Sequence, residues 1–163
     1  MSKVTHIAVH HTVTKRAETV PTIRKFHIEG RGWRDIGYHR LISQPNSSAP
    51  VRVYQGRQED GDLDWEPYEF GAHVKGANSS SISVSLIGNF SEEPLPPAMF
   101  AALVDECASL CRRFGLSADR VLGHREFPEQ ATECPGLKVD MGAVRVAVLG
   151  RLSGSAYRSK GGK

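Results

Sequence analysis

Two residues with the chemistry of metal ligands stand in one irregular segment of the chain, Gly123–Gly136. They are His124 and Cys134, and imidazole and thiolate are both good ligands for zinc. Pro128 and Pro135 prevent the segment from being a regular helix or strand throughout. A stiff loop that presents both side chains would supply half of a metal site. The simpler alternative is a loop histidine beside a small buried cysteine.

The other half can come from the segment 4–12, whose sequence is VTHIAVHHT. It is short, rich in β-branched residues and apolar on both faces, which is typical of a buried strand. His10 and His11 stand near its end, and His6 shares the parity of His10. Because successive side chains on a strand point to opposite faces, only one of the pair can face a given site. Periodicity alone leaves both candidates open.

Three protein ligands would leave the fourth tetrahedral position open for water, as catalytic zinc requires. Zinc lowers the pKa of a bound water towards ~7 and polarises a carbonyl group, so these residues imply hydrolysis of an acyl bond. The reaction also needs a hydrogen-bond donor for the developing oxyanion or the leaving amine. Tyr38 and Thr132 carry suitable hydroxyl groups.

The composition fits one globular domain. The chain has 163 residues, of which 39% are hydrophobic and 24% are charged, so it can bury a core of ordinary size. No run approaches the ~18 apolar residues of a membrane span. The net charge of +3 comes from the segment 153–163, which carries Arg158, Lys160 and Lys163 and no acid. The rest is nearly neutral, so we expect neither nucleic-acid binding nor membrane insertion.

The N-terminal residues and the cysteines both indicate the compartment. The first residues contain no apolar stretch followed by a small-residue cleavage site, so we expect no signal peptide and synthesis in the cytoplasm. Three cysteines in such a chain do not form a disulfide scaffold. Cys107 and Cys111 are four positions apart in a helical pattern and are expected to face the core.

Strand and helix patterns intermix along the chain, which favours an α/β domain with a mixed central sheet flanked by helices. The hydrophobic periodicity predicts strands at 4–12, 33–43, 51–55, 82–88 and 121–122, and helices at 18–29, 97–114 and 140–152. We place His27 on the surface or edge of the first helix. The acidic segment 56–71 is a candidate substrate-binding wall, and it lacks the acidic residue that would complete a calcium loop. The domain is expected to span 1–152, followed by a disordered basic tail over 153–163.

Five segments, in this order, resemble the type 2 N-acetylmuramoyl-L-alanine amidases, a family that includes phage amidase-type lysozymes and peptidoglycan recognition proteins. The segments are IAVHHT (7–12), DIGYH (35–39), GAHVKGANS (71–79), SLIGNF (85–90) and GHREF…TECPG (123–136). Each alone would be a weak signal, but together they are highly specific. The resemblance implies the family's fold, a mixed sheet flanked by helices.

The resemblance also implies the ligands of a Zn²⁺ cofactor. The first histidine of the strand-end pair binds zinc in the family, which selects His10 over His11. The histidine of the Gly-His-Arg block implies His124 as the second ligand, and the cysteine before Pro-Gly implies Cys134 as the third.

Four further residues take roles from the same resemblance. The tyrosine of Gly-Tyr-His implies Tyr38 as the residue that assists the zinc-bound water. Thr132 stands where recognition proteins carry threonine and some phage members carry lysine, and it would donate to the carbonyl oxygen or oxyanion. His73 and Asn78 would line the substrate groove, although a structural role in the turn is an alternative.

The implied function is hydrolysis of the amide between N-acetylmuramic acid and L-alanine in bacterial peptidoglycan. We expect a monomeric lytic amidase, such as a phage endolysin, that reaches the cell wall after release. One alternative is an intracellular amidase that recycles anhydro-muropeptides, although those enzymes place an aspartate where Cys134 stands. The other is a zinc-independent peptidoglycan-binding module, although such relatives typically lose the cysteine.

Overall fold

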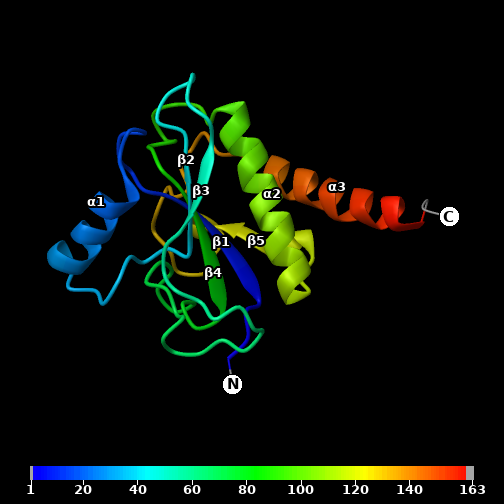
Figure 1. Ribbon diagram of the computed structural model, residues 1–163, viewed down its shortest axis with the longest axis horizontal. Helices are drawn as coiled ribbons and strands as arrows, with labels where there is room; N and C mark the ends of the chain where they lie inside the picture. Colours follow the sequence, from blue (N-terminus) through cyan, green and yellow to red (C-terminus); the bar gives the residue numbers. More distant parts are fainter. Residues whose placement is uncertain (1, 161–163) are drawn as a thin grey trace.

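The computed structural model describes residues 2–160, with side chains up to Gly154. Five strands form one mixed sheet in the order β3-β2-β4-β1-β5 (Figure 1). The strands are β1 (His6–His11), β2 (Arg40–Ser43), β3 (Arg52–Gln55), β4 (Ser81–Leu86) and β5 (Val121–Gly123). All neighbouring pairs are parallel except β2 and β3, which are antiparallel. The predicted α/β class with a mixed central sheet is confirmed.

The helices cover both faces of the sheet. Figure 1 shows α1 (Val20–Lys25) on one side and α2 (Pro97–Phe114) and α3 (Met141–Lys160) on the other. Helix α1 passes directly into a π-helical turn, Phe26–Gly30. Two short 3₁₀ turns flank β5, at Ala118–Arg120 and His124–Glu126. The sheet is therefore the middle layer, and its loops are left to build a site.

Alternating side chains on the central strands build two different environments. Ile82, Val84 and Leu86 of β4 pack into the main core with α2 and α3. Ser83 and Ser85 point to the opposite face and are equally buried. Small polar side chains in the middle of a sheet leave room above them for larger polar groups. The serine face of β4 therefore lies next to polar side chains such as that of His39, which contacts Ser83.

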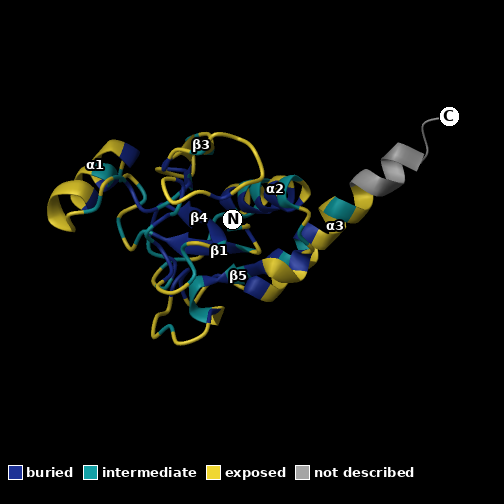
Figure 2. Ribbon diagram, turned by 90° about the horizontal axis from the view of Figure 1, so that it is seen from below, coloured by how far each residue is buried: buried dark blue, intermediate teal, exposed yellow. Residues whose placement is uncertain are grey.

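Helix α2 has the predicted bounds because its start and stop signals are strong. Pro97 occupies the first turn, where a missing N–H costs nothing. Gly115 ends the helix in the left-handed conformation, with φ of 66°, and its N–H donates to the carbonyl of Cys111. The apolar stripe of the helix, including Cys107 and Cys111, faces the core as expected. Figure 2 shows that α2 carries both buried and exposed residues. All three cysteines are free thiols.

The bounds of two predicted elements differ from the structure by six residues or more. The strand expected at 33–43 begins only at Arg40, because N–H groups of the preceding segment donate to side chains and form no strand ladder. The carbonyl oxygens of Tyr38 and His39 still accept from the N–H groups of Arg57 and Gly56. The N–H of Gly37 donates to Nδ1 of His27, and the N–H of His39 donates to Oγ of Ser83. Helix α3 continues to Lys160 rather than ending at Leu152. Residues 161–163 of the expected disordered tail lie outside the described residues.

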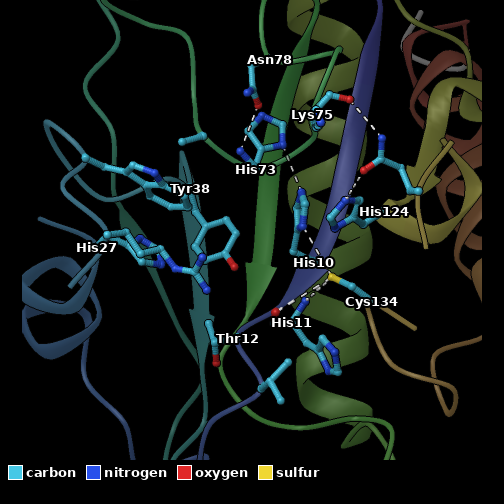
Figure 3. A pocket seen from close by; sticks show the side chains of 15 residues that line it. His10, His11, Thr12, His27, Tyr38, His73, Lys75, Asn78, His124 and Cys134 are labelled. Atoms are coloured by element: carbon cyan, nitrogen blue, oxygen red, sulfur yellow. Dashed lines mark hydrogen bonds between the residues drawn. The ribbon is translucent and has the colours of Figure 1, made fainter. Parts of the chain in front are cut away.

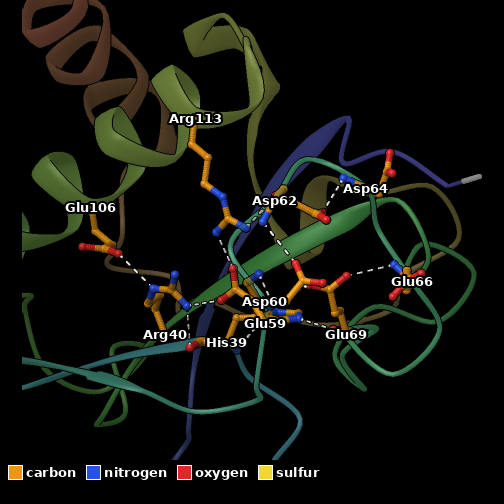
Figure 4. A network of polar contacts seen from close by, with 11 residues as sticks. His39, Arg40, Glu59, Asp60, Asp62, Asp64, Glu66, Glu69, Glu106 and Arg113 are labelled. Carbon is orange, nitrogen blue, oxygen red and sulfur yellow. Dashed lines mark hydrogen bonds and ion pairs between the residues drawn. The ribbon is translucent and has the colours of Figure 1, made fainter.

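Buried ion pairs anchor the acidic segment 56–71. Glu59 is paired with both Arg40 and Arg113, which ties the segment to β2 and α2 (Figure 4). Buried Glu69 accepts hydrogen bonds from the N–H groups of Asp60 and Glu66. These contacts show that Glu59 and Glu69 hold the loop in place from within. Among residues 2–160, no helix is long and apolar enough to cross a membrane.

Candidate active site

Strands β1 and β5 bring together residues that are far apart in the sequence. The two strands are parallel neighbours, and Val9 pairs with Gly123, so His10 and His124 follow at the same edge of the sheet. The centroids of their rings lie 4.8 Å apart. Sγ of Cys134 lies 3.5 Å from Nδ1 of His10. The ligand atoms of these three residues all lie within 4.8 Å of one another (Figure 3).

The structure distinguishes the two histidines that periodicity left open. His10 faces His124 and Cys134, whereas the ring of His11 points to the other face of β1. There Nδ1 of His11 accepts a hydrogen bond from the N–H of Phe90, at 3.1 Å. The backbone N–H of His11 donates to Sγ of Cys134, at 3.4 Å. His11 therefore supports the cysteine through its main chain, while His10 presents its ring.

The protonation states of the three residues suit a metal ion. Burial lowers the pKa of His10 well below its ordinary value, and burial also lowers that of His124. Both imidazoles are therefore neutral at pH 7 and carry a free lone pair. Burial raises the pKa of the Cys134 thiol to about 12, so the metal-free thiol is protonated. Two imidazoles and a thiol that loses its proton on binding form a donor set that fits tetrahedral zinc with one position open.

A cavity of about 600 Å³ opens over this group. Tyr38 stands across it, with its ring centroid 5.3 Å from that of His10. The pKa of Tyr38 is raised to about 12, mainly by burial and to a lesser extent by the nearby Cys134. Its phenol therefore remains a hydrogen-bond donor at neutral pH. The cavity is lined by His10, His11, Thr12, Val13, His27, Arg31, Trp33, Tyr38, Ala72, His73, Lys75, Asn78, His124, Gln130 and Cys134. None of these residues comes from the acidic segment 56–71, which was the expected substrate wall.

His73 and Asn78 both line the cavity, and they are linked to each other. Oδ1 of Asn78 accepts hydrogen bonds from the N–H groups of His73 and Val74, at 2.9 and 3.0 Å. Nδ1 of His73 lies 3.0 Å from Nε2 of His10. Asn78 therefore holds the turn that carries His73, and His73 contacts the ring nitrogen of His10 that faces away from Cys134. The structural and groove-lining roles coexist in these two residues.

Thr132 lies at the edge of the site rather than in the main cavity. It lines an adjoining pocket together with His11, Val13 and Cys134. Its Oγ1 accepts a hydrogen bond from the N–H of Cys134, at 3.1 Å. The hydroxyl therefore shapes the turn before the cysteine and still has its own proton to donate. Its predicted catalytic role stays a prediction.

The position predicted for His27 is wrong. We expected this residue on the surface of the first helix, but it is buried in the cavity wall. Its Nδ1 accepts from the N–H of Gly37, at 3.0 Å, and burial lowers its pKa to about 4. The cause is the π-helical turn that follows α1, which rotates the ring inward. Helical periodicity at 3.6 residues per turn contains no signal for such a turn.

Sequence reasoning also missed other residues of the cavity wall, namely Arg31, Trp33, Lys75 and Gln130. The guanidinium of Arg31 lies 5.5 Å from the ring centroid of Phe26 and 5.3 Å from that of Trp33. Gln130 contacts His124 directly, at 3.0 Å. Gln130 could have been suspected from the sequence, because it is a polar residue in the loop between His124 and Cys134. Nothing in the local pattern distinguished Arg31 from other surface arginines.

The domain therefore has a His-His-Cys group beside the carboxyl ends of two parallel strands, under an open cavity. Such a group could hold a catalytic metal ion. The sequence model of the N-acetylmuramoyl-L-alanine amidases, Amidase_2, matches residues 1–137. The chain belongs to this family, as its sequence blocks predicted.

Individual relatives agree with this assignment. Peptidoglycan-recognition protein SC1a of Drosophila melanogaster is 31% identical over 144 residues, which cover 83% of this chain and 70% of that protein. The structure resembles the amidase LysC of Clostridium intestinale URNW, with a TM-score of 0.71 and 26% identity over 89% of this chain and 85% of that one. It also resembles the Ph2119 endolysin of a Thermus scotoductus MAT2119 bacteriophage, with a TM-score of 0.68 and 28% identity over 91% and 86% of the two chains.

Proposed function

We propose that this protein is a zinc-dependent amidase that cleaves the bond between N-acetylmuramic acid and L-alanine in peptidoglycan. The observation that carries the proposal is the group of His10, His124 and Cys134, with ligand atoms within 4.8 Å of one another. Tyr38 faces this group across a cavity large enough for part of a muropeptide. Membership of the amidase family supplies the reaction class.

The chain's own residues would divide the work of the reaction. When bound, zinc supplies a water of lowered pKa and polarises the scissile carbonyl. His10, His124 and Cys134 would hold it. The protonated phenol of Tyr38 would donate a hydrogen bond to the water or to the developing oxyanion. The hydroxyl of Thr132 is a second candidate donor, and His73 and Asn78 would contact the substrate along the cavity wall.

A peptidoglycan-binding module without catalysis is the main competing function, because the family includes recognition proteins. The retained cysteine favours the enzyme, since a thiol with a raised pKa contributes little to peptide binding but becomes a strong zinc ligand. Mass spectrometry of digested peptidoglycan distinguishes the two functions. New L-alanine amino termini with intact glycan strands are expected from the amidase, and a pure binding module produces none.

The proposed biological role is lysis of the bacterial cell wall, as in an endolysin that is made in the cytoplasm and acts after release. The similarity to the Ph2119 endolysin and to the amidase LysC supports this role. The alternative is recycling of soluble anhydro-muropeptides inside the cell. Assays of the purified protein on intact cell walls and on soluble anhydro-muropeptides separate the two roles. Faster turnover of the soluble substrate would contradict the lytic role.

A further inference from the structure

The side chain of Gln130 bridges His124 and the opposite wall of the cavity. Its Oε1 lies 3.0 Å from Nε2 of His124. Its Nε2 donates to the carbonyl oxygen of Lys75 at 3.0 Å and to that of Pro128 at 3.2 Å. Figure 3 shows Lys75 and His124 on either side of this link. The amide therefore uses both of its donors on backbone carbonyls and its oxygen on the histidine.

These contacts fix which way the amide faces. The two carbonyl oxygens can only accept hydrogen bonds, so they require the NH₂ group of Gln130. The amide oxygen must then face His124, and it too can only accept. Nε2 of His124 consequently carries the proton, since a lone pair there would face a second lone pair. In a neutral imidazole the other nitrogen, Nδ1, is then the one that has the free lone pair.

The two histidines of the group are thus supported in parallel. Nε2 of His10 contacts Nδ1 of His73, which leaves Nδ1 of His10 beside Sγ of Cys134. His10 is also held by its strand β1, whereas His124 lies on a short 3₁₀ turn and is only half-buried. Its ring would be free to rotate without a fixed partner. Metal-binding histidines are commonly held by such a contact on their second nitrogen.

We propose that Gln130 is a positioning residue that holds His124 in the Nε2–H tautomer and directs its Nδ1 towards His10 and Cys134. The loops 128–134 and 72–80 are thereby coupled, because the amide joins the ligand to the carbonyl of Lys75. The proposal rests on the proposed zinc site. It adds a specific prediction about the metal-free protein, because the tautomer is set before any ion binds.

The test compares Gln130→Met with Gln130→Glu. Methionine has a similar length but neither accepts from His124 nor donates to the carbonyls, so zinc affinity is expected to fall about 10- to 100-fold. Glutamate keeps an acceptor for the Nε2 proton but loses both donors to the carbonyl oxygens, so its affinity should fall less than that of Gln130→Met. Gln55→Met, on the exposed edge strand β3, is the matched control and should bind zinc as wild type does. Affinity is measured by competition with a chelator, and thermal melts check the fold.

A second readout uses no metal. In ¹⁵N-resolved NMR spectra of the metal-free protein, His124 should be the pure Nε2–H tautomer in wild type and in Gln130→Glu, and a mixture in Gln130→Met. An unchanged tautomer and unchanged zinc affinity in Gln130→Met would overturn the proposal, and so would a Gln130→Glu variant that keeps the tautomer but binds zinc no better than Gln130→Met. If wild type shows the expected tautomer but binds no zinc, the proposed function fails and the tautomer assignment stands.

Discussion

Sγ of Cys134 lies 3.5 Å from Nδ1 of His10, although 124 positions of sequence separate the two residues. The sheet creates this contact by placing the end of β1 beside the end of β5, where the loop to Cys134 begins. The contact is polar, buried and open to the cavity on one side. A protonated thiol beside a neutral imidazole gains little in the metal-free protein, which agrees with the proposed role of both residues as ligands of one ion.

Replacing Cys134 with alanine should abolish cell-wall lysis and zinc binding while the protein stays folded. The substitution removes one sulfur atom, so the free energy of unfolding should fall by about 1–2 kcal/mol. Metal content, circular dichroism and the turbidity of cell-wall suspensions measure the three effects. Cys107→Ala is the control, because Cys107 is buried in the main core on α2. That variant should lose stability but keep zinc and activity.

Zinc binding should release about one proton per ion at neutral pH, because burial raises the pKa of the Cys134 thiol to about 12. His10 and His124 contribute no further proton, since burial lowers the pKa of both. The apparent affinity should therefore rise about tenfold for each unit of pH between ~6.5 and ~8. Calorimetry in buffers of different ionisation enthalpy counts the proton. A count near zero would mean that Cys134 does not bind the ion as a thiolate.

Tyr38→Phe should lower kcat by about 10²-fold or more and leave zinc content unchanged. Tyr38 precedes β2 in the chain, its ring faces His10, and it is partly buried, so phenylalanine fits the same space. Only the donor is lost, and it is not a ligand. Single-turnover kinetics on a soluble muropeptide, together with metal analysis, check the prediction. Loss of zinc from this variant would show that Tyr38 supports the metal site and not the reaction.

The sequence was sufficient for the sheet and for α2, and it predicted that His10, His124 and Cys134 come together, as they do in the structure. Helix α2 has an amphipathic stripe between a proline and a glycine, and His124 and Cys134 stand in a loop that prolines stiffen. The resemblance to the family then selected His10 over His11. The structure gives the physical reason, because the ring of His11 faces away and accepts a hydrogen bond from the N–H of Phe90.

The wall of the cavity could not be predicted in the same way. His27 is turned inward by a π-helical turn, and the segment before β2 is held by side chains such as those of His27 and Ser83. Both features depend on partners that are remote in sequence. Gln130 contacts the carbonyl oxygen of Lys75, and this contact exists only after the two loops have folded together. Local patterns describe elements, whereas this wall consists of contacts between elements.

His39 should make the protein sensitive to acid. It is fully buried, its Nε2 lies 2.7 Å from the carbonyl oxygen of Glu69, and its Nδ1 accepts from the N–H of Ser83. Burial lowers its pKa from 6.5 to about 4. As the pH falls from about 6.5 to about 4, the unfolded chain gains a proton at this residue and the native state does not. The free energy of unfolding should therefore fall by roughly 3 kcal/mol across this window.

The variant His39→Asn tests this origin of the acid sensitivity. Asparagine can replace the acceptor at Nδ1 but cannot be protonated, so its free energy of unfolding should depend less on pH between about 4 and 6.5. The variant should be less stable than wild type at pH 7.5, since the bond to Glu69 is lost. Urea unfolding at several pH values gives both numbers. Parallel curves for the two proteins would assign the acid sensitivity to other groups.

Val13 is strained, and relieving the strain should stabilise the protein. Its φ is 56°, in the left-handed region that β-branched residues avoid, and its side chain is 62% exposed. The backbone is held there because the N–H of Thr12 bonds to Leu86 and that of Thr14 to Gly88. Val13→Asn should raise the free energy of unfolding by about 1 kcal/mol, because asparagine tolerates this conformation.

A matched substitution on a helix separates strain from the chemistry of the side chain. Val146 is exposed on α3, where valine and asparagine have similar helix propensities, so Val146→Asn should change stability by less than about 0.5 kcal/mol. Val13→Gly should stabilise less than Val13→Asn, since glycine also makes the unfolded chain more flexible. Thermal and urea unfolding rank the three variants. If Val13→Asn is no more stable than Val146→Asn, the conformation of Val13 costs the fold nothing. If it is more stable but cleaves peptidoglycan more slowly, the strain serves the wall of the cavity that Val13 shares with His10.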